Sequence, residues 1–197
     1  MLCFSSLAYQ ASAKTKILLL GDSLSAAYGM QEEEGWVALL KRQLADEKPD
    51  LELINASISG ETTGGGLQRL DHLLLQHSPN WLWIELGGND GLRGYPVAKI
   101  RQNLDALVKK AQKRGINVLI NQIQIPPNYG RKYTSKFTQV FPSIAAENNV
   151  SLLPFFMLPL VEKPEMLLAD KIHPSKQAQP LIAAWIKPKL LAELAQN

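Results

Sequence analysis

Residues 16–23 read KILLLGDS, an apolar run that ends in a turn-forming Gly-Asp pair followed by a serine. A continuous apolar run of this length, closed by a turn signal, is typical of a strand buried on both faces. Gly-Asp-Ser occurs in ordinary turns, and the same order can present a serine nucleophile at the end of a strand. The stretch therefore predicts a buried strand and leaves two interpretations of Ser23, as a turn residue or as a catalyst.

The rest of the chain alternates short apolar runs with longer amphipathic ones. Strands are expected at Lys16–Leu20, Leu51–Ala56, Trp81–Leu86, Asn117–Ile123 and Val150–Leu153. Helices are expected at Trp36–Glu47, Leu67–Gln76, Val97–Arg114, Tyr133–Asn148 and Ser175–Leu194. Pro142, Pro180 and Pro188 should bend or break the last two helices. This alternation predicts an α/β fold of three layers, in which helices cover both faces of a central, mostly parallel five-stranded sheet.

Composition and charge exclude several classes of protein. The 197 residues suffice for one domain with a sizeable core and are too few for two ordinary domains. The net charge of +3 is spread along the chain, and the densest basic run, at 130–136, is too short for a nucleic-acid-binding stripe. No segment has the eighteen consecutive apolar residues of a membrane span. We expect a monomer with no nucleic-acid partner and no stable membrane insertion.

The first thirteen residues differ in character from the remainder. A short apolar patch precedes Ala-Ser-Ala at 11–13, the small-x-small pattern of a signal-peptidase site, although a positive leading region is missing. We interpret 1–13 as the remnant of an export signal and 14–197 as a single domain, which predicts a periplasmic or secreted protein. A non-native leader on a cytoplasmic protein is the alternative. The only cysteine, Cys3, lies in this segment, so the domain has no disulfide, cysteine zinc site or catalytic thiol.

Polar, glycine-rich loops follow the first four expected strands, at 21–28, 57–66, 87–94 and 124–131. In an open parallel sheet, ligands bind at the carboxyl ends of the strands near a switch in strand order. The four loops should therefore meet at one edge of the sheet. Within the second loop, the glycine run at 64–66 suggests a loosely ordered segment.

Acyl transfer requires a nucleophile, a base, an orienting acid and N–H donors for the developing oxyanion. Ser23 is the candidate nucleophile, expected to open a short helix after the first strand. Gly60 can present an unobstructed backbone N–H, and Asn89 can donate from its side-chain amide. Taken alone, the Gly-Asp-Ser and Gly-x-Asn-Asp motifs are explained more readily by turn chemistry than by catalysis.

The chain offers three histidines as the base. His72 and His77 lie in or just after the second expected helix, which predicts a position on its surface or at its end. His173 follows Asp170 by three residues, so Asp170 can accept Nδ1–H and leave Nε2 facing a serine. The alternative is a turn aspartate with a histidine held before Pro174.

These short motifs together resemble the four sequence blocks of the GDSL/SGNH hydrolase family. The matching segments, in the same order and with similar spacing, are GDSLS at 21–25, Gly60, GGND at 87–90 and DKIH at 170–173. The likeness extends along nearly the whole chain from Ile17, through NASISGET, ELGGNDGLRG, PPNYGRKY and LLPFFM. The chain is similar to bacterial members of this family that act as thioesterases and lysophospholipases.

The resemblance implies a flavodoxin-like SGNH fold and a serine hydrolase of carboxylic esters and thioesters, among them acyl-CoA thioesters, lysophospholipids and aryl esters. It implies that Ser23 attacks the acyl carbonyl, that His173 takes its proton and that Asp170 orients the imidazole. It also implies an oxyanion hole made by the N–H groups of Ser23 and Gly60 and by the side chain of Asn89. The substrate would be a small acyl ester or thioester of medium to long chain.

The loops at 91–96 and 125–130 should flank this site, and their apolar residues are candidates for an acyl groove. These substrate-binding candidates are Leu92, Tyr95, Ile125, Pro126 and Tyr129. Ordinary loop packing is the competing explanation for each of them.

Other chemistries match the sequence less well. The nucleophile elbow of an α/β-hydrolase, Gly-x-Ser-x-Gly, is absent, and the segment at 60–69 lacks the Lys-Ser/Thr of a phosphate loop. Asp170 and His173 are at most a two-ligand fragment of a metal site, so we expect no metal and no cofactor. Two alternatives remain open: a carbohydrate acetyl esterase on the same fold, and a binding protein that has lost catalysis.

Overall fold

The computed structural model describes residues 14–160 and 162–196, so the export-signal interpretation of 1–13 lies outside the described residues. The strands are β1 (Thr15–Gly21), β2 (Leu51–Asn55), β3 (Trp81–Glu85), β4 (Asn117–Asn121) and β5 (Ser151–Leu153). They form one sheet in the order β2-β1-β3-β4-β5, and every neighbouring pair is parallel. The predicted α/β class and the five-stranded parallel sheet are confirmed.

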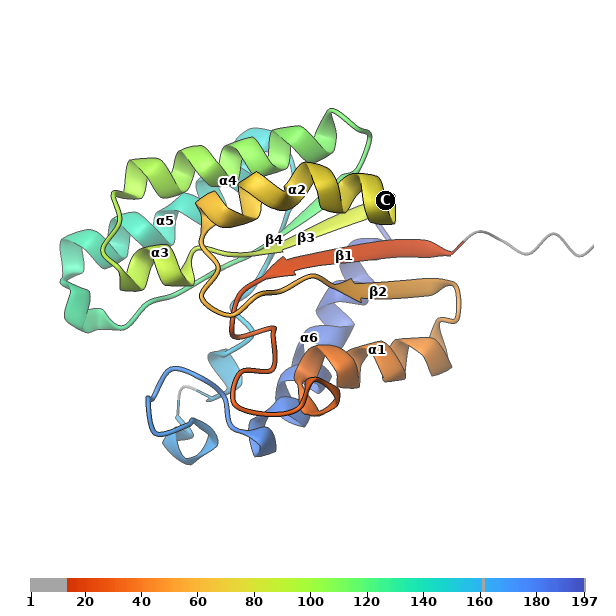
Figure 1. The fold of residues 1–197 in the computed structure, drawn as a ribbon. Coiled ribbons are helices and arrows are strands. Elements are labelled where there is room, and N and C mark those ends of the chain that lie inside the picture. The colour runs from red at the N-terminus through yellow and green to blue at the C-terminus, as the bar shows by residue number, and fades with distance from the viewer. Residues whose placement is uncertain (1–13, 161, 197) are drawn as a thin grey trace, which may run out of the picture.

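Helices cover both faces of this sheet. They are α1 (Trp36–Glu47), α2 (Thr63–His77), α3 (Gly88–Leu92), α4 (Val97–Gln112), α5 (Arg131–Asn148) and α6 (Gln179–Leu194). Helices α1 and α6 lie on one face, and α2, α4 and α5 lie on the other (Figure 1). No helix in the described part of the chain is long and apolar enough to cross a membrane.

Strand β1 shows why the opening apolar run folds as it does. Ile17 and Leu19 belong to the core cluster under α1 and α6, whereas Leu18 and Leu20 belong to the cluster under α2, α4 and α5. All four side chains are fully buried. Because successive side chains of a strand point to opposite faces, a strand covered on both faces must be apolar at every position.

Proline did not break the last two long helices as the sequence suggested. Helix α5 continues through Pro142, whose ring removes the N–H that the Thr138 carbonyl would otherwise bind. The Gln122 side chain donates to that carbonyl instead, at 3.1 Å. Pro180 lies in the first turn of α6, where a missing N–H costs nothing, and the helix also continues through Pro188.

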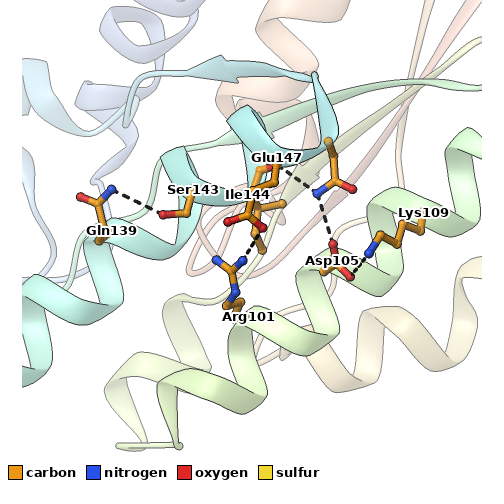
Figure 2. Close-up of polar contacts among 8 residues, drawn as sticks. Arg101, Asp105, Lys109, Gln139, Ser143, Ile144 and Glu147 are labelled. Atoms are coloured by element: carbon orange, nitrogen blue, oxygen red, sulfur yellow. Dashed lines mark hydrogen bonds and ion pairs between the residues drawn. The ribbon is translucent and has the colours of Figure 1, made fainter.

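The outer surfaces of α4 and α5 are joined by polar contacts (Figure 2). Arg101 forms an ion pair with Glu147, and Asp105 accepts hydrogen bonds from Lys109 at 2.8 Å and from Asn148 at 3.2 Å. Exposed pairs of this kind contribute at most about 1 kcal/mol each. The apolar cluster beneath, which includes Leu104, therefore carries most of the stability of this layer.

The glycine run at 64–66 is helical, which corrects the expectation of a loose loop. Helix α2 begins at Thr63, and the Thr62 side chain caps it by accepting from the Gly65 N–H at 3.1 Å. Gly66 lies against the sheet, where an added Cβ would come within 2.4 Å of Leu86 Cδ1. The close approach of α2 to the sheet selects glycine here, although a run of three glycines locally resembles a loop.

We expect Gly66→Ala to lower the free energy of unfolding by about 1–3 kcal/mol, because the added methyl group overpacks the contact with Leu86. Gly64 provides the matched control, since a Cβ there would make only ordinary contacts, the nearest at 3.5 Å from Asn103. Gly64→Ala should leave stability unchanged or raise it by up to about 1 kcal/mol. Urea denaturation measures both effects, and equal effects of the two substitutions would contradict the packing explanation.

Candidate active site

The carboxyl ends of β1 and β3 are neighbours at the point where the strand order reverses. The register pairs Gly21 with Glu85, the last residue of each strand. Ser23 follows β1 by two residues and lies in consecutive turns, in which the Ala26 N–H donates to the Asp22 carbonyl at 2.9 Å. The expectation that Ser23 opens a helix was wrong, since Ser23 lies in turns and not at a helix N-terminus.

Ser23, His173 and Asp170 form a continuous chain of side-chain contacts. His173 Nε2 lies 2.9 Å from Ser23 Oγ, and His173 Nδ1 lies 2.7 Å from Asp170 Oδ2. The other Asp170 oxygen accepts from the backbone N–H groups of Ile172 and His173, at 2.9 and 3.0 Å. Partial burial acts to raise the pKa of Asp170, but these hydrogen bonds outweigh it and hold the pKa below its usual value. The Asp170 carboxylate is therefore ionised and fixed against the imidazole.

The segment that carries Asp170 and His173 is a hairpin loop. Leu167 pairs with Pro174 in an antiparallel bridge, and the Leu168 N–H donates to the His173 carbonyl at 2.8 Å. The Lys171 N–H closes a turn on Leu168 at 2.9 Å, with Lys171 in the left-handed region at φ +58°. That conformation costs a residue with a Cβ about 1–2 kcal/mol.

Two buried side chains tie this hairpin to the turn that holds Ser23. Gln179 accepts from the Trp36 N–H at 2.9 Å and donates to the Pro174 carbonyl at 3.1 Å. The Trp36 indole donates in turn to the Leu24 carbonyl, also at 2.9 Å. The turn and the hairpin are therefore held to the same pair of side chains. The Tyr28 ring stacks on the imidazole of His173, with the two ring centroids 4.1 Å apart.

Gly60 and Asn89, the other two sequence-predicted residues, border the same cleft as Ser23. Asn89 lies in the short helix α3, which the sequence analysis missed, and its Nδ2 donates to Asp22 Oδ2 at 3.2 Å. Gly60 has φ +80°, a conformation open to glycine, and its carbonyl accepts from Arg93 at 3.1 Å. The structure thus brings Ser23, His173, Gly60 and Asn89 to one cleft.

Two buried carboxyl groups lie beneath the Ser23 turn. Asp22 Oδ1 accepts from the Leu24 N–H at 3.0 Å, so Asp22 binds both the turn and Asn89. Glu85 Oε2 accepts from the Ser25 hydroxyl at 2.7 Å and from the Asp22 N–H at 3.3 Å. Burial raises the pKa of Asp22 to about 6, and burial together with the nearby Asp22 raises the pKa of Glu85 well above its usual range. Burial therefore favours the protonated form of Glu85.

Asp90 fixes α3 to the start of α2. Its two carboxyl oxygens accept from the Thr63 hydroxyl at 2.6 Å and from the Thr63 N–H at 2.8 Å. The Thr63 hydroxyl also accepts from Asn103, at 3.0 Å. Since Asn89 precedes Asp90, these bonds hold the backbone from which the Asn89 amide projects.

The cleft beside Ser23 has a volume of about 430 Å³ and a mainly apolar wall. Leu92, Ile125 and Pro126 border it, as the sequence analysis expected. Tyr95 and Tyr129 do not: the Tyr95 side chain is exposed, and the Tyr129 hydroxyl is bound to the neighbouring loop. The Tyr129 hydroxyl donates to the Leu92 carbonyl at 2.8 Å, and the Tyr95 carbonyl accepts from Tyr133.

Several cleft residues carried no clear signal in the sequence. The wall also includes Leu24, Tyr28, Phe155, Met157, Leu160 and Leu167. Phe155 and Met157 follow the carboxyl end of β5, so the strand-end rule applied to the fifth strand would have found them. His72 and His77 lie on α2, outside the cleft wall, as expected.

The raised pKa of Asp22 makes a prediction about stability. The folded protein binds a proton at Asp22 below about pH 6, whereas the unfolded chain does so only below about pH 4. The stability that this proton provides is complete below about pH 4 and is lost as the pH rises through 6, so that ionised Asp22 costs folding roughly 2–3 kcal/mol. Relative to wild type, Asp22→Asn should therefore gain about that much stability between about pH 4 and pH 8.

Urea denaturation at the two pH values measures this difference. Asp105→Asn is the control of opposite sign, because hydrogen bonds from Lys109 and Asn148 outweigh burial and lower the pKa of Asp105. Its removal should cost stability at high pH and none at low pH. Parallel pH curves for wild type and Asp22→Asn would refute the assignment of a raised pKa to Asp22.

Comparison with known proteins agrees with this geometry. The model of the GDSL-like Lipase/Acylhydrolase family matches residues 19–179. The chain is 43% identical over 194 residues to an arylesterase of Vibrio mimicus, covering 98% of this chain and 97% of that protein. It is 43% identical over 184 residues to thioesterase 1/protease 1/lysophospholipase L1 of Escherichia coli K12, covering 93% and 87%.

The fold is likewise similar to that of a solved esterase. The crystal structure of the psychrotrophic esterase EstA from Pseudoalteromonas sp., inhibited by monoethylphosphonate, superposes with a TM-score of 0.86 at 49% identity. The match covers 93% of this chain and 98% of that one. From the family match over most of its length and from these relatives, the chain belongs to the GDSL-like lipase/acylhydrolase family of ester-hydrolysing enzymes.

Proposed function

We propose that this enzyme is a serine hydrolase that cleaves the ester and thioester bonds of acyl substrates through an acyl-enzyme intermediate. The contact of Ser23 Oγ with His173 Nε2 at 2.9 Å, continued from Nδ1 to Asp170 at 2.7 Å, supports this most directly. A hydroxyl, an imidazole and a carboxylate in this order are the requirements for activating a serine at neutral pH.

In the acylation step, Ser23 Oγ attacks the acyl carbonyl carbon while its proton moves to His173 Nε2. The carbonyl π electrons move to oxygen, giving a tetrahedral oxyanion. When the oxyanion collapses, the bond to the leaving oxygen or sulfur breaks, and His173 returns its proton to that atom. Water, deprotonated by His173, then attacks the acyl-enzyme. In the second collapse the bond between the acyl carbon and Ser23 Oγ breaks, His173 returns its proton to Oγ, and the carboxylic acid is released.

The oxyanion would be bound by the N–H groups of Ser23 and Gly60 and by the Asn89 amide. Asn89 Nδ2 carries two hydrogens, and its contact with Asp22 engages one of them. The other is available to a ligand in the cleft. Asp22 binds both the Asn89 amide and the Leu24 N–H, which follows Ser23 in the turn. These bonds fix the Asn89 amide and the backbone at Ser23 relative to each other, which reduces the reorganisation needed when negative charge develops on the substrate oxygen.

The cleft supports acyl chains of medium to long length as the substrate class. Its wall combines aliphatic and aromatic side chains with few polar groups, as expected for an alkyl chain. The named activities of the relatives, arylesterase in one and thioesterase with lysophospholipase in the other, include esters and thioesters of this kind. We also propose that the enzyme acts in the periplasm or outside the cell, which the Ala-Ser-Ala pattern at 11–13 supports.

Replacing the nucleophile tests the mechanism. Ser23→Ala should lower kcat/KM for a p-nitrophenyl acyl ester by at least about a thousandfold and should abolish labelling by a fluorophosphonate. Asn89→Ala should retain labelling but lower kcat by about a hundredfold, because only an oxyanion donor is lost. Near-normal turnover by Ser23→Ala would exclude the proposed mechanism, and a wild-type enzyme that fails to react with the probe would favour a binding protein.

A series of p-nitrophenyl esters from acetyl to dodecanoyl tests the substrate class. We expect kcat/KM to rise from acetyl to octanoyl, whereas a carbohydrate acetyl esterase would prefer acetyl. Leu92→Trp narrows the cleft and should shift the optimum to shorter chains. Tyr95→Trp is the control, since Tyr95 is close in sequence but outside the cleft wall. A chain-length optimum that Leu92→Trp leaves unchanged would argue against this acyl site.

A further inference from the structure

Lys171 is the only lysine or arginine among the described residues that border the cleft. It is exposed, and the described part of the chain shows no ion pair or side-chain hydrogen bond to it. The carboxylate of Asp22, which borders the cleft, is bound to Asn89, and that of Asp170, which precedes Lys171 in the chain, is bound to His173. The Lys171 ammonium is therefore not held in an ion pair and is free to meet a ligand at this wall.

The backbone at Lys171 has a left-handed conformation that a lysine adopts only at a cost in energy. Its φ of +58° closes the hairpin turn, and turns of this kind favour glycine or asparagine at the left-handed position. An exposed lysine gains little from packing that would offset the strain. Strained non-glycine residues cluster at functional sites, because there the side chain supplies something that glycine cannot.

The position of Lys171 relative to His173 indicates which part of a substrate it meets. In the proposed mechanism, His173 donates a proton to the leaving oxygen or sulfur, so the leaving group departs beside the hairpin that carries His173. Lys171 precedes His173 by two residues on that hairpin. Arg93 is not part of the cleft wall, but it lies next to Gly60, to whose carbonyl it donates at 3.1 Å. The adjacent Glu61 is paired with Arg69 at 2.6 Å.

Resting on the proposed function, we propose that Lys171 is a specificity-determining residue that binds a phosphate group of the substrate's leaving group. The enzyme would then favour acyl esters and thioesters whose alcohol or thiol carries phosphate over neutral ones with the same acyl chain. Two sources supply such a phosphate: the glycerol phosphate of a lysophospholipid and the phosphates of coenzyme A. An ammonium ion binds either as a point charge without demanding one geometry.

Two matched substrate pairs separate this effect from catalysis. Octanoyl-CoA is compared with octanoyl-N-acetylcysteamine, a thioester without phosphate. 1-Octanoyl-glycerol-3-phosphate is compared with 1-octanoyl-glycerol.

Lys171→Gln and Lys171→Gly remove the charge, and the glycine also relieves the backbone strain, so loss of folding cannot explain its effect. Lys171→Arg restores the charge. Lys113→Gln, at the C-terminal end of α4 and the opposite edge of the sheet, is the control for net charge.

We expect Lys171→Gln and Lys171→Gly to lower kcat/KM about tenfold for the phosphate-bearing member of at least one pair. The neutral members should change less than about twofold, and Lys171→Arg should restore most of the loss. Added salt should reduce the wild-type preference and have little effect in Lys171→Gln. A response confined to the CoA pair, or to the glycerol pair, identifies the source of the phosphate.

Equal losses on phosphate-bearing and neutral substrates would overturn the proposal, because Lys171 would then act only through the hairpin and His173. Unchanged kinetics in every variant would overturn it as well. A wild-type enzyme that hydrolyses none of the four octanoyl compounds would instead contradict the proposed function, and Ser23→Ala distinguishes the two failures by abolishing all hydrolysis irrespective of charge.

Discussion

The pairing of β1 with β3 is the constraint on which the candidate active site, at the carboxyl ends of these strands, depends. Both strands are buried between two layers of helices, and their register places Gly21 beside Glu85. The chain leaves both strands at the same edge, so that the turn holding Ser23 and the helix holding Asn89 start from neighbouring points. The bond from Asn89 to Asp22 then joins residues 67 positions apart. A large apolar core thus determines the position of a small number of polar groups.

The polar groups under this edge reduce stability and serve the site. Burial raises the pKa of Asp22 and of Glu85, and Glu85 Oε1 has no hydrogen-bond partner in the described structure. Gly21 leaves the space that they need, since a Cβ there would come within 2.8 Å of Glu85 Oε2 and 2.6 Å of Ser57 Oγ. The glycine that precedes Asp-Ser is therefore required by the side chains that lie against it, and not only favoured by a turn. The surrounding core offsets the desolvation of these groups.

Much of the fold and of the site could be predicted from the sequence, because the strands are continuous apolar runs and the polar loops follow their carboxyl ends. The prediction failed where tertiary contacts outweigh local preference. The sequence of Gly64–Gly66 is typical of a loop, but these residues are helical because α2 packs closely against Leu86. Pro142 would be expected to break a helix, but the Gln122 side chain binds the Thr138 carbonyl that the proline leaves without an N–H partner. Tyr95 and Tyr129 could not be separated from Leu92, since the sequence does not show that the Tyr95 side chain is exposed or that the Tyr129 hydroxyl binds the Leu92 carbonyl.

The alignment of Ser23 with His173 has a separate structural basis, because the hairpin that carries His173 does not follow a strand directly. Trp36 and Gln179, both buried, link the Leu24 carbonyl on one side to the Pro174 carbonyl on the other. Each bond of this link lies outside the reacting groups. The 2.9 Å contact between Ser23 and His173 is therefore supported by bonds that the proposed proton transfer would leave intact, so the two groups would keep their alignment from one turnover to the next.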